Sequence, residues 1–208
     1  MKKEEPALIE LLASNLPPLK TKKKKFTQVF YENMGLADKV IIASGCISVS
    51  SITELTRILE LNNKPRLELI AGMHYFEGFS IPQFQAIQKL NKLLDQNKLG
   101  NIYLASVSKY HGKCYSFLNN NDPIAGILGS SNLSAITTTE RQYESDILSK
   151  DPAFNNELLN FITELLNGVK KYFEFYNSKR FHQSLNYQTP DEMHQAFIVD
   201  EEEVKKAA

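Results

Sequence analysis

Apolar runs of strand length alternate with amphipathic stretches of helix length over residues 39–107, and this order allows few folds. Three of the runs predict buried strands: Lys39–Ser44, Arg66–Ala71 and Asn101–Val107. Two residue pairs between them have the spacing of a capping box, which predicts a helix after each: Ser51 with Glu54, and Ser80 with Gln83. Strands that alternate with helices predict an α/β domain with a mostly parallel (mixed) sheet sandwiched by helices.

The pattern continues to a change in character near Gly168. Three further strands are predicted: the segment that holds His111 and Lys113, the apolar run that ends at Gly129, and Tyr143–Leu148. Asp151-Pro152 begins a last helix, and Gly168 fits the residue just past its end. The predicted divisions are an N-terminal connector (1–25), the α/β domain (26–168) and a short helical C-terminal tail (169–208).

The totals limit the classes of protein that fit. A chain of 208 residues buries one substantial core. The 24 Lys and Arg balance 24 Asp and Glu, so any contact with nucleic acid has to come from local patches. Two cysteines without C-x-x-C spacing give neither a disulfide framework nor a zinc site. With no apolar run of membrane length and no signal peptide, we expect a cytoplasmic protein without a membrane partner.

One local patch is the lysine cluster of the connector, Lys20 and Lys22–Lys25. The simpler interpretation is a solvated connector. The alternative is an arm that contacts phosphates, since clustered lysines give salt-sensitive affinity that is blind to sequence.

The residues that suggest chemistry lie between Lys109 and Glu144. His111 and Lys113 are two apart in a strand-like segment, so both side chains leave the same face, while Cys114 points away into the core. Gly112 adds no side chain that would obstruct a ligand. The small residues Gly129–Ser131 let a bulky anion approach, and Asn132 adds an amide donor. A charged lysine repels a cation, so this set suits a phosphate better than a metal, and we expect neither metal nor cofactor.

H-x-K, followed about twenty residues later by G-S-x-N and then by a glutamate, resembles the single-motif nucleases of the phospholipase-D superfamily. The resemblance is strongest to the catalytic domain of NgoFVII-type restriction endonucleases. It extends upstream to A-S-G-C-I-S (43–48) and to L-I-A-G-M (69–73), and covers about residues 25–165. It implies a phospholipase-D-like fold and a phosphodiesterase that cleaves DNA.

The resemblance also implies roles for the residues. In that superfamily a histidine attacks phosphorus, water resolves the phosphohistidine, and a second histidine protonates the leaving oxygen. Because this chain has one H-x-K motif, a two-fold homodimer would supply the second histidine. His111 would then be nucleophile in one subunit and acid in the other. Lys113, Asn132 and Ser130 would bind the phosphate oxygens. Glu144, or Glu140 as the alternative, would accept the other ring N–H of His111.

Residues 169–197 carry a second resemblance. Their Y-N-x-x-R-x-H-x-x-L-x-Y-x-T-P pattern is similar to the C-terminal end of an insertion-sequence transposase with a retroviral-type integrase core. The metal-binding carboxylates of that family would precede the segment and are replaced here, so integrase chemistry is not expected. We interpret the chain as a restriction-type gene interrupted by a mobile element, truncated before its sequence-recognition domain.

The sequence is compatible with three functions. The first, which we favour, is a metal-independent DNA endonuclease with weak cleavage and no sequence preference. The second is an inactive DNA-binding remnant fused to a DNA-integration fragment. The third is a phospholipase-D-type phosphodiesterase that acts on another substrate.

Overall fold

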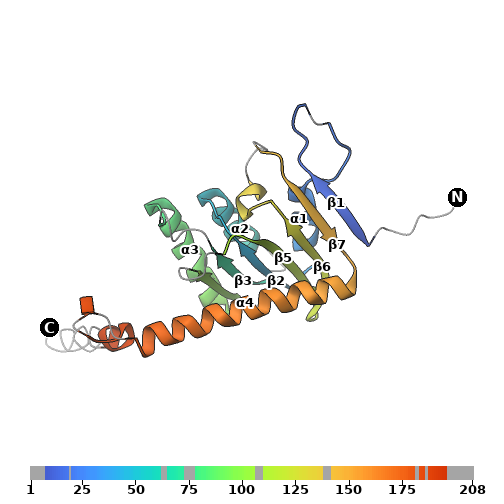
Figure 1. Ribbon diagram of the computed structural model, residues 1–208. Helices are drawn as coiled ribbons and strands as arrows, with labels where there is room; N and C mark the ends of the chain where they lie inside the picture. Colours follow the sequence, from blue (N-terminus) through green and yellow to red (C-terminus); the bar gives the residue numbers. More distant parts are fainter. Residues whose placement is uncertain are drawn as a thin grey trace. The chain divides into compact units, whose positions relative to one another are not determined.

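The computed structural model describes residues 8–18, 20–61, 65–72, 78–105, 110–137, 142–180, 183–185 and 187–195. Its chain divides into two compact units, residues 1–164 and 165–208. The first unit holds a seven-stranded sheet and its covering helices (Figure 1). No described helix is both long enough and apolar enough to cross a membrane.

The sheet has the strand order β1-β7-β6-β5-β2-β3-β4. The strands are β1 (Ile9–Ala13), β2 (Lys39–Ser44), β3 (Arg66–Ala71), β4 (Gly100–Leu104), β5 (Lys113–Asn119), β6 (Asp122–Gly129) and β7 (Ser145–Ser149). β2, β3 and β4 are parallel, and the other neighbours are antiparallel. The mixed α/β sheet is confirmed, although its parallel part is limited to these three strands.

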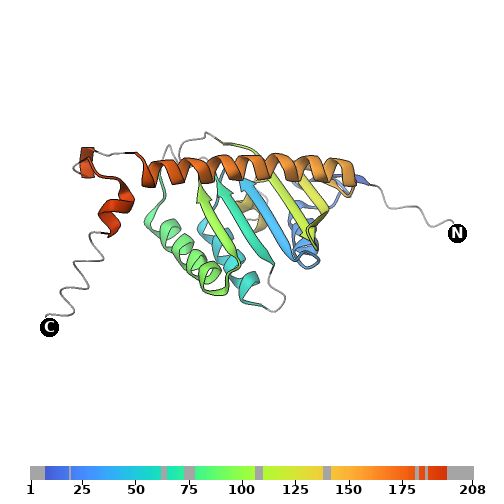
Figure 2. The same cartoon turned by 90° about the horizontal axis from the view of Figure 1, so that it is seen from below.

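Helices cover both faces of the sheet (Figure 2). On one face lie α1 (Phe26–Met34), α2 (Val49–Glu60) and α3 (Ile81–Asn97). Phe26 and Phe30 of α1 pack on Tyr115 of β5, with ring centroids 5.0 and 6.0 Å apart. On the other face lies the first half of α4 (Pro152–Ser178), where Leu158 packs against Gly126 of β6. Large apolar side chains on the α1–α3 side, fully buried, form most of the core.

Several predicted boundaries differ from the structure. Helix α2 begins after Ser48, which forms the capping box with Ser51, so Ser51 is not the N-cap. Ser80 and Gln83 form the expected box at the start of α3. Gly168 lies inside α4 and does not end it, because the apolar pattern continues past the glycine and Leu166 and Val169 are buried. Helix α1 was not predicted, since its N-cap, Lys25, makes no capping hydrogen bond with its side chain.

The segment predicted as a connector contains a strand of the sheet. Ile9–Ala13 forms β1 and pairs antiparallel with β7. In the second unit, Gln183–Leu185 forms a 3-10 turn (η3). Thr189 and Glu192 form a capping box at the start of residues 190–195, which are helical. Arg180 lies over the ring of Tyr176, 5.6 Å from its centroid, so two residues of the transposase-like pattern contact each other.

Candidate active site

Gly45 follows β2 and Gly72 follows β3, and both lie against the backbone of residues 110–112, which leads into β5. The Gly45 N–H donates to the carbonyl of Gly112 (3.0 Å), and the Gly72 N–H donates to that of Ser44 (2.9 Å). A methyl group on Gly45 would stand 3.2 Å from the ring of His111, and one on Gly72 would overlap the carbonyl of Tyr110. Only glycine lets the backbone pass this closely, so these two positions fix where His111 emerges.

His111 and Lys113 lie in contact at this edge of the sheet. Lys113 is the first residue of β5, and His111 precedes the strand. The ammonium of Lys113 is buried, donates to the carbonyl of His111 at 2.7 Å, and lies 3.2 and 3.1 Å from the two ring nitrogens. An ammonium has no acceptor, so the ring nitrogen that bonds to it contributes a lone pair. The His111 side chain itself is exposed.

Gly112 was predicted to leave space for a ligand, and in the structure the side chain of Tyr110 lies in that space. A methyl group there would overlap the ring of Tyr110, which folds beneath Gly112 and donates its hydroxyl to Cys114 Sγ at 3.3 Å. The missing side chain therefore makes room for a tyrosine and not for a ligand. Burial raises the pKa of both the Tyr110 hydroxyl and the Cys114 thiol. Cys114 is buried, as predicted.

Asn132 reaches the same edge from the end of β6. Its Oδ1 accepts the N–H of Cys46 at 3.0 Å, next to the Gly45 that contacts His111. Because a backbone N–H requires an acceptor, this bond turns the Nδ2 donor of Asn132 away from Cys46. A second tie is the Leu133 N–H, which donates to Ser44 Oγ at 3.0 Å. The loop after β2 therefore contacts both residues: Cys46 bonds to Asn132, and Gly45 lies against His111.

Asp146 was not predicted as part of the site, yet it holds the loop that carries Asn132. It is 2% exposed and accepts the N–H of Ser131 at 2.9 Å and its hydroxyl at 2.6 Å. Tyr115 donates to the carbonyl of Ser131 at 2.7 Å. Burial raises the pKa of Asp146, and the hydrogen bonds from Ser131 oppose this shift. The sequence did contain a signal for this role, because Asp146 interrupts an apolar strand, S-D-I-L, and a buried carboxylate needs hydrogen-bond donors around it.

Glu144 lies at the same edge, on the side of Ser130. Its carboxylate accepts the hydroxyl of Ser130, whose oxygen accepts the N–H of Ser145 at 2.9 Å. Within the described residues, no hydrogen bond joins Glu144 to His111. The backbone of Glu144 pairs with Ser14, through Ser14 N–H to its carbonyl (2.9 Å) and its own N–H to Ser14 Oγ (3.0 Å). Glu140, the alternative carboxylate, lies outside the described residues.

The described residues contain no cluster of three or more His, Cys, Asp or Glu that could hold a metal ion. What the edge offers is an exposed imidazole, a buried ammonium against it, an amide and a hydroxyl. These groups suit an anion with several oxygens, because each oxygen accepts from a different donor. The imidazole is a potential nucleophile.

Comparisons with known proteins identify the family of the chain and its fold. The family model of the NgoFVII restriction endonuclease N-terminal PLD domain matches residues 24–173. No curated protein sequence matches the chain.

Solved structures show the same fold at low identity. Nuc, a phospholipase D family member from Salmonella typhimurium, has a TM-score of 0.52 at 12% identity, over 76% of this chain and 93% of that one. NucT from Helicobacter pylori has a TM-score of 0.51 at 14% identity, over 76% of this chain and 96% of that one. A polyphosphate kinase from Porphyromonas gingivalis has a TM-score of 0.52 at 12% identity, over 77% of this chain and 26% of that one. These likenesses confirm the predicted fold.

Proposed function

Because the chain belongs to the family of the NgoFVII restriction endonuclease N-terminal PLD domain, we propose that it is a metal-independent DNA endonuclease that acts through a phosphohistidine intermediate. The observation that carries the proposal is the contact of the Lys113 ammonium with the ring nitrogens of His111, at 3.1 and 3.2 Å. An imidazole beside a fixed positive charge combines a potential nucleophile with a group that attracts the phosphate.

The proposed reaction has two steps. A ring nitrogen of His111 attacks phosphorus, a P–N bond forms, and the P–O bond to the leaving oxygen breaks. That oxygen takes a proton from a second imidazole. Water then attacks phosphorus, gives its proton to the second imidazole, and the P–N bond breaks to release the phosphate end. Both steps are displacements assisted by acid–base transfer.

The remaining residues stabilise and orient in this scheme. Lys113 and Asn132 bind the non-bridging oxygens, with their stabilisation growing as charge builds on phosphorus, and Ser130 adds a hydroxyl donor. Glu144 accepts the ring N–H of His111 that does not react, which fixes the tautomer. The hydrogen bond that Asn132 Oδ1 accepts from the Cys46 N–H supports the role of Asn132, because it holds the amide at this edge and leaves its Nδ2 donor for the phosphate. The Ser130 hydroxyl donates to Glu144 in the structure, so the proposal requires that substrate replace this bond, with Ser130 then donating to phosphate and Glu144 accepting from His111.

The second imidazole comes from another copy of the chain in this proposal. A two-fold axis brings the same surface from both subunits together, so two His111 side chains meet across it. A row of apolar side chains close to this edge of the sheet is available for the contact: Leu11, Ile147 and Leu128 are 48, 40 and 38% exposed, and paired in register on adjacent strands. We refer to these three residues as the apolar row.

We further propose that cleavage is weak and without sequence preference. The side chains assigned to this site contact phosphate oxygens, and such contacts carry no sequence information. Mapping the cleaved ends of a plasmid of known sequence measures this directly. Ends that cluster at one short sequence would contradict it.

The central experiment is nicking of a supercoiled plasmid by the full chain in excess EDTA. We expect cleavage by the wild type, none by His111→Ala, and wild-type cleavage by His194→Ala, an exposed histidine in the second unit. A protein–DNA adduct on a denaturing gel would identify the intermediate. Unchanged cleavage by His111→Ala would exclude the mechanism. Turnover of phosphatidylcholine vesicles in place of DNA would favour the phospholipase function.

A further inference from the structure

The loop between β1 and α1 lies next to the candidate site and not apart from it. Its first residue, Ser14, makes the two backbone-directed bonds to Glu144, and Tyr143 donates its hydroxyl to the carbonyl of Pro17 at 2.5 Å. At the far end, the Ala13 N–H donates to the carbonyl of Lys24 at 3.1 Å, which closes the loop on itself. The described part of the loop is therefore fixed to Tyr143 and Glu144, which lead into β7 (Figure 1).

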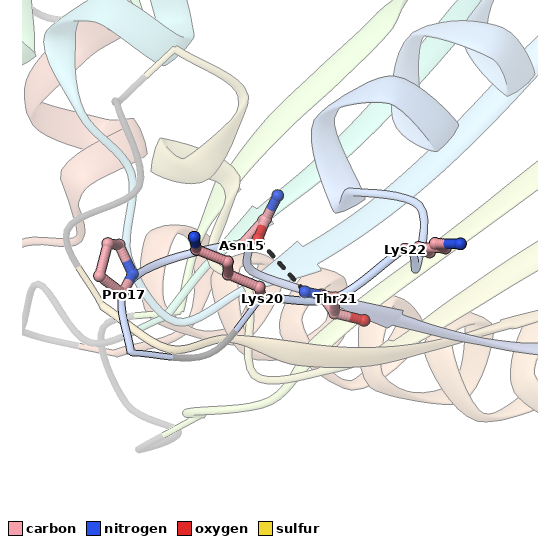
Figure 3. Close-up of a pocket in the computed structure, with 5 residues that line it drawn as sticks. All are labelled: Asn15, Pro17, Lys20, Thr21 and Lys22. Atoms are coloured by element: carbon pink, nitrogen blue, oxygen red, sulfur yellow. Dashed lines mark hydrogen bonds between the residues drawn. The ribbon is translucent and has the colours of Figure 1, made fainter.

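This loop encloses a pocket of about 430 Å³ (Figure 3). Its lining residues are Asn15, Pro17, Lys20, Thr21 and Lys22. The Thr21 N–H donates to Asn15 Oδ1 at 3.3 Å, and Thr21 Oγ1 accepts the N–H of Lys23 at 3.1 Å, which leaves the Thr21 hydroxyl hydrogen to donate. The pocket thus combines a hydroxyl donor with two lysines.

The charge of the pocket is not neutralised within the described residues. Lys24 pairs with Glu10 at 3.1 Å, and the Glu144 carboxylate is bonded to Ser130. Lys20 and Lys22 are exposed and have no ion pair with a described residue. In a chain whose total charge is zero, two unpaired ammonium groups beside a phosphodiester site form a local positive surface. Such a surface attracts a polyanion and repels a metal ion.

The Lys20 and Lys22 side chains point to opposite sides of the loop in Figure 3. We propose that each of them contacts a different backbone phosphate of the nucleic acid strand whose scissile phosphate lies at His111. This assignment rests on the proposed function and deepens it. The ligands are non-scissile phosphates of the same strand, so the loop positions the strand and takes no part in the chemistry. Contacts of this kind give affinity that falls with salt and does not depend on sequence.

The experiment compares two double variants in the full chain with His111→Ala, which keeps the DNA intact. Lys20→Gln/Lys22→Gln removes the pocket lysines, and Lys89→Gln/Lys92→Gln removes two exposed lysines of α3 as a control for charge. Fluorescence anisotropy with a labelled duplex of mixed sequence gives the dissociation constant over a range of salt. We expect roughly ten-fold weaker binding at 0.1 M salt for the pocket variant, and a salt slope smaller by about two.

The outcome decides the assignment. Equal affinity and slope in the two double variants, or no salt-dependent binding by the parent, would overturn it. A second readout separates it from the proposed function. This readout uses chains that keep His111 and can therefore cleave. Hydrolysis of bis(p-nitrophenyl) phosphate, which has no neighbouring phosphate, should be the same for the wild type and for Lys20→Gln/Lys22→Gln, whereas the KM of this double variant for DNA should be higher than that of the wild type. Loss on the small diester would also overturn the pocket's role. Pocket-dependent binding of DNA, together with no cleavage of either substrate by the chain that keeps His111, would refute the proposed function alone.

Discussion

The carbonyl oxygen of Tyr110 lies directly against Gly72, in the space that the side chain of any other residue would occupy. Gly72 directly follows β3, and Tyr110 precedes the histidine of the H-x-K motif. The position of His111 is therefore set by a residue far away in the sequence, through a backbone approach that tolerates no methyl group.

Gly72→Ala tests this relationship. The added methyl group forces the backbone of Tyr110 to move, so we expect a free energy of unfolding lower by about 1–3 kcal/mol. A displacement of the nucleophile by an ångström costs roughly a hundred-fold in rate, so plasmid nicking should fall by about that factor. Gly168→Ala is the matched control, because nothing lies within 4 Å of its methyl position. It should stabilise the helix by about 0.5–1 kcal/mol and leave nicking unchanged.

Asp146→Asn tests the support beneath Asn132 through the pH dependence of stability. Burial raises the folded pKa of Asp146 above its ordinary value of 3.8, so in that range the folded chain binds a proton more tightly than the unfolded chain. The contribution of Asp146 to stability is then complete below pH 3.8 and declines as pH rises through the raised pKa. We expect the Tm difference, wild type minus variant, to shrink from acid toward neutral pH.

Calorimetric melting across this pH range provides the measurement, with Asp122→Asn on the exposed end of β6 as the control for loss of a carboxylate. A Tm difference that grows with pH would show that the bonds from Ser131 outweigh burial. At neutral pH the variant should also nick DNA more slowly, because one of the two acceptors for Ser131 is replaced by a donor.

Thiol labelling tests the packing beneath the H-x-K motif. Cys46 is half-buried, whereas Cys114 is buried and burial raises its pKa. Since the thiolate is the reactive form, N-ethylmaleimide should modify Cys46 in the folded protein and Cys114 only in guanidinium. Peptide mass spectrometry identifies the site. Equal rates at the two thiols in the folded protein would contradict the contact of Cys114 with Tyr110.

Ile147→Asp tests whether the apolar row is the surface of a homodimer. A buried charge without a partner opposes association, so the variant should sediment as a monomer at concentrations where the wild type is a dimer, and should lose nicking. Leu36→Asp, at a side chain that is 62% exposed in the loop after α1, is the matched control. A wild type that sediments as a monomer yet nicks DNA would contradict the shared site.

The sequence supplied the candidate residues of the site but not the contacts among them. His111 and Lys113 have the spacing that brings two side chains to one face, and the structure brings them into contact. Asn132 was named for its amide, yet its tie to Cys46 joins residues that are distant in sequence. Asp146, Gly45 and Gly72 escaped prediction because their roles are close contacts between distant segments, which no local pattern reports.

The sequence by itself determined most of the strands and helices after residue 38, because the periods of apolar residues record which side of each element is buried. It also determined which reactive groups the chain carries, namely the imidazole of His111, the ammonium of Lys113 and the amide of Asn132, because the identity of a side chain does not depend on packing. Tertiary structure alone decided the rest. β1 belongs to the sheet because it pairs with a strand near the other end of the first unit. Ser48, not Ser51, caps α2, since the Ser48 hydroxyl accepts the N–H of Ser51 in the third helical position. The loop between β1 and α1, which carries Lys20 and Lys22, lies beside Glu144 because β1 pairs with β7. Strand pairing of this kind brings together segments whose proximity no local pattern encodes.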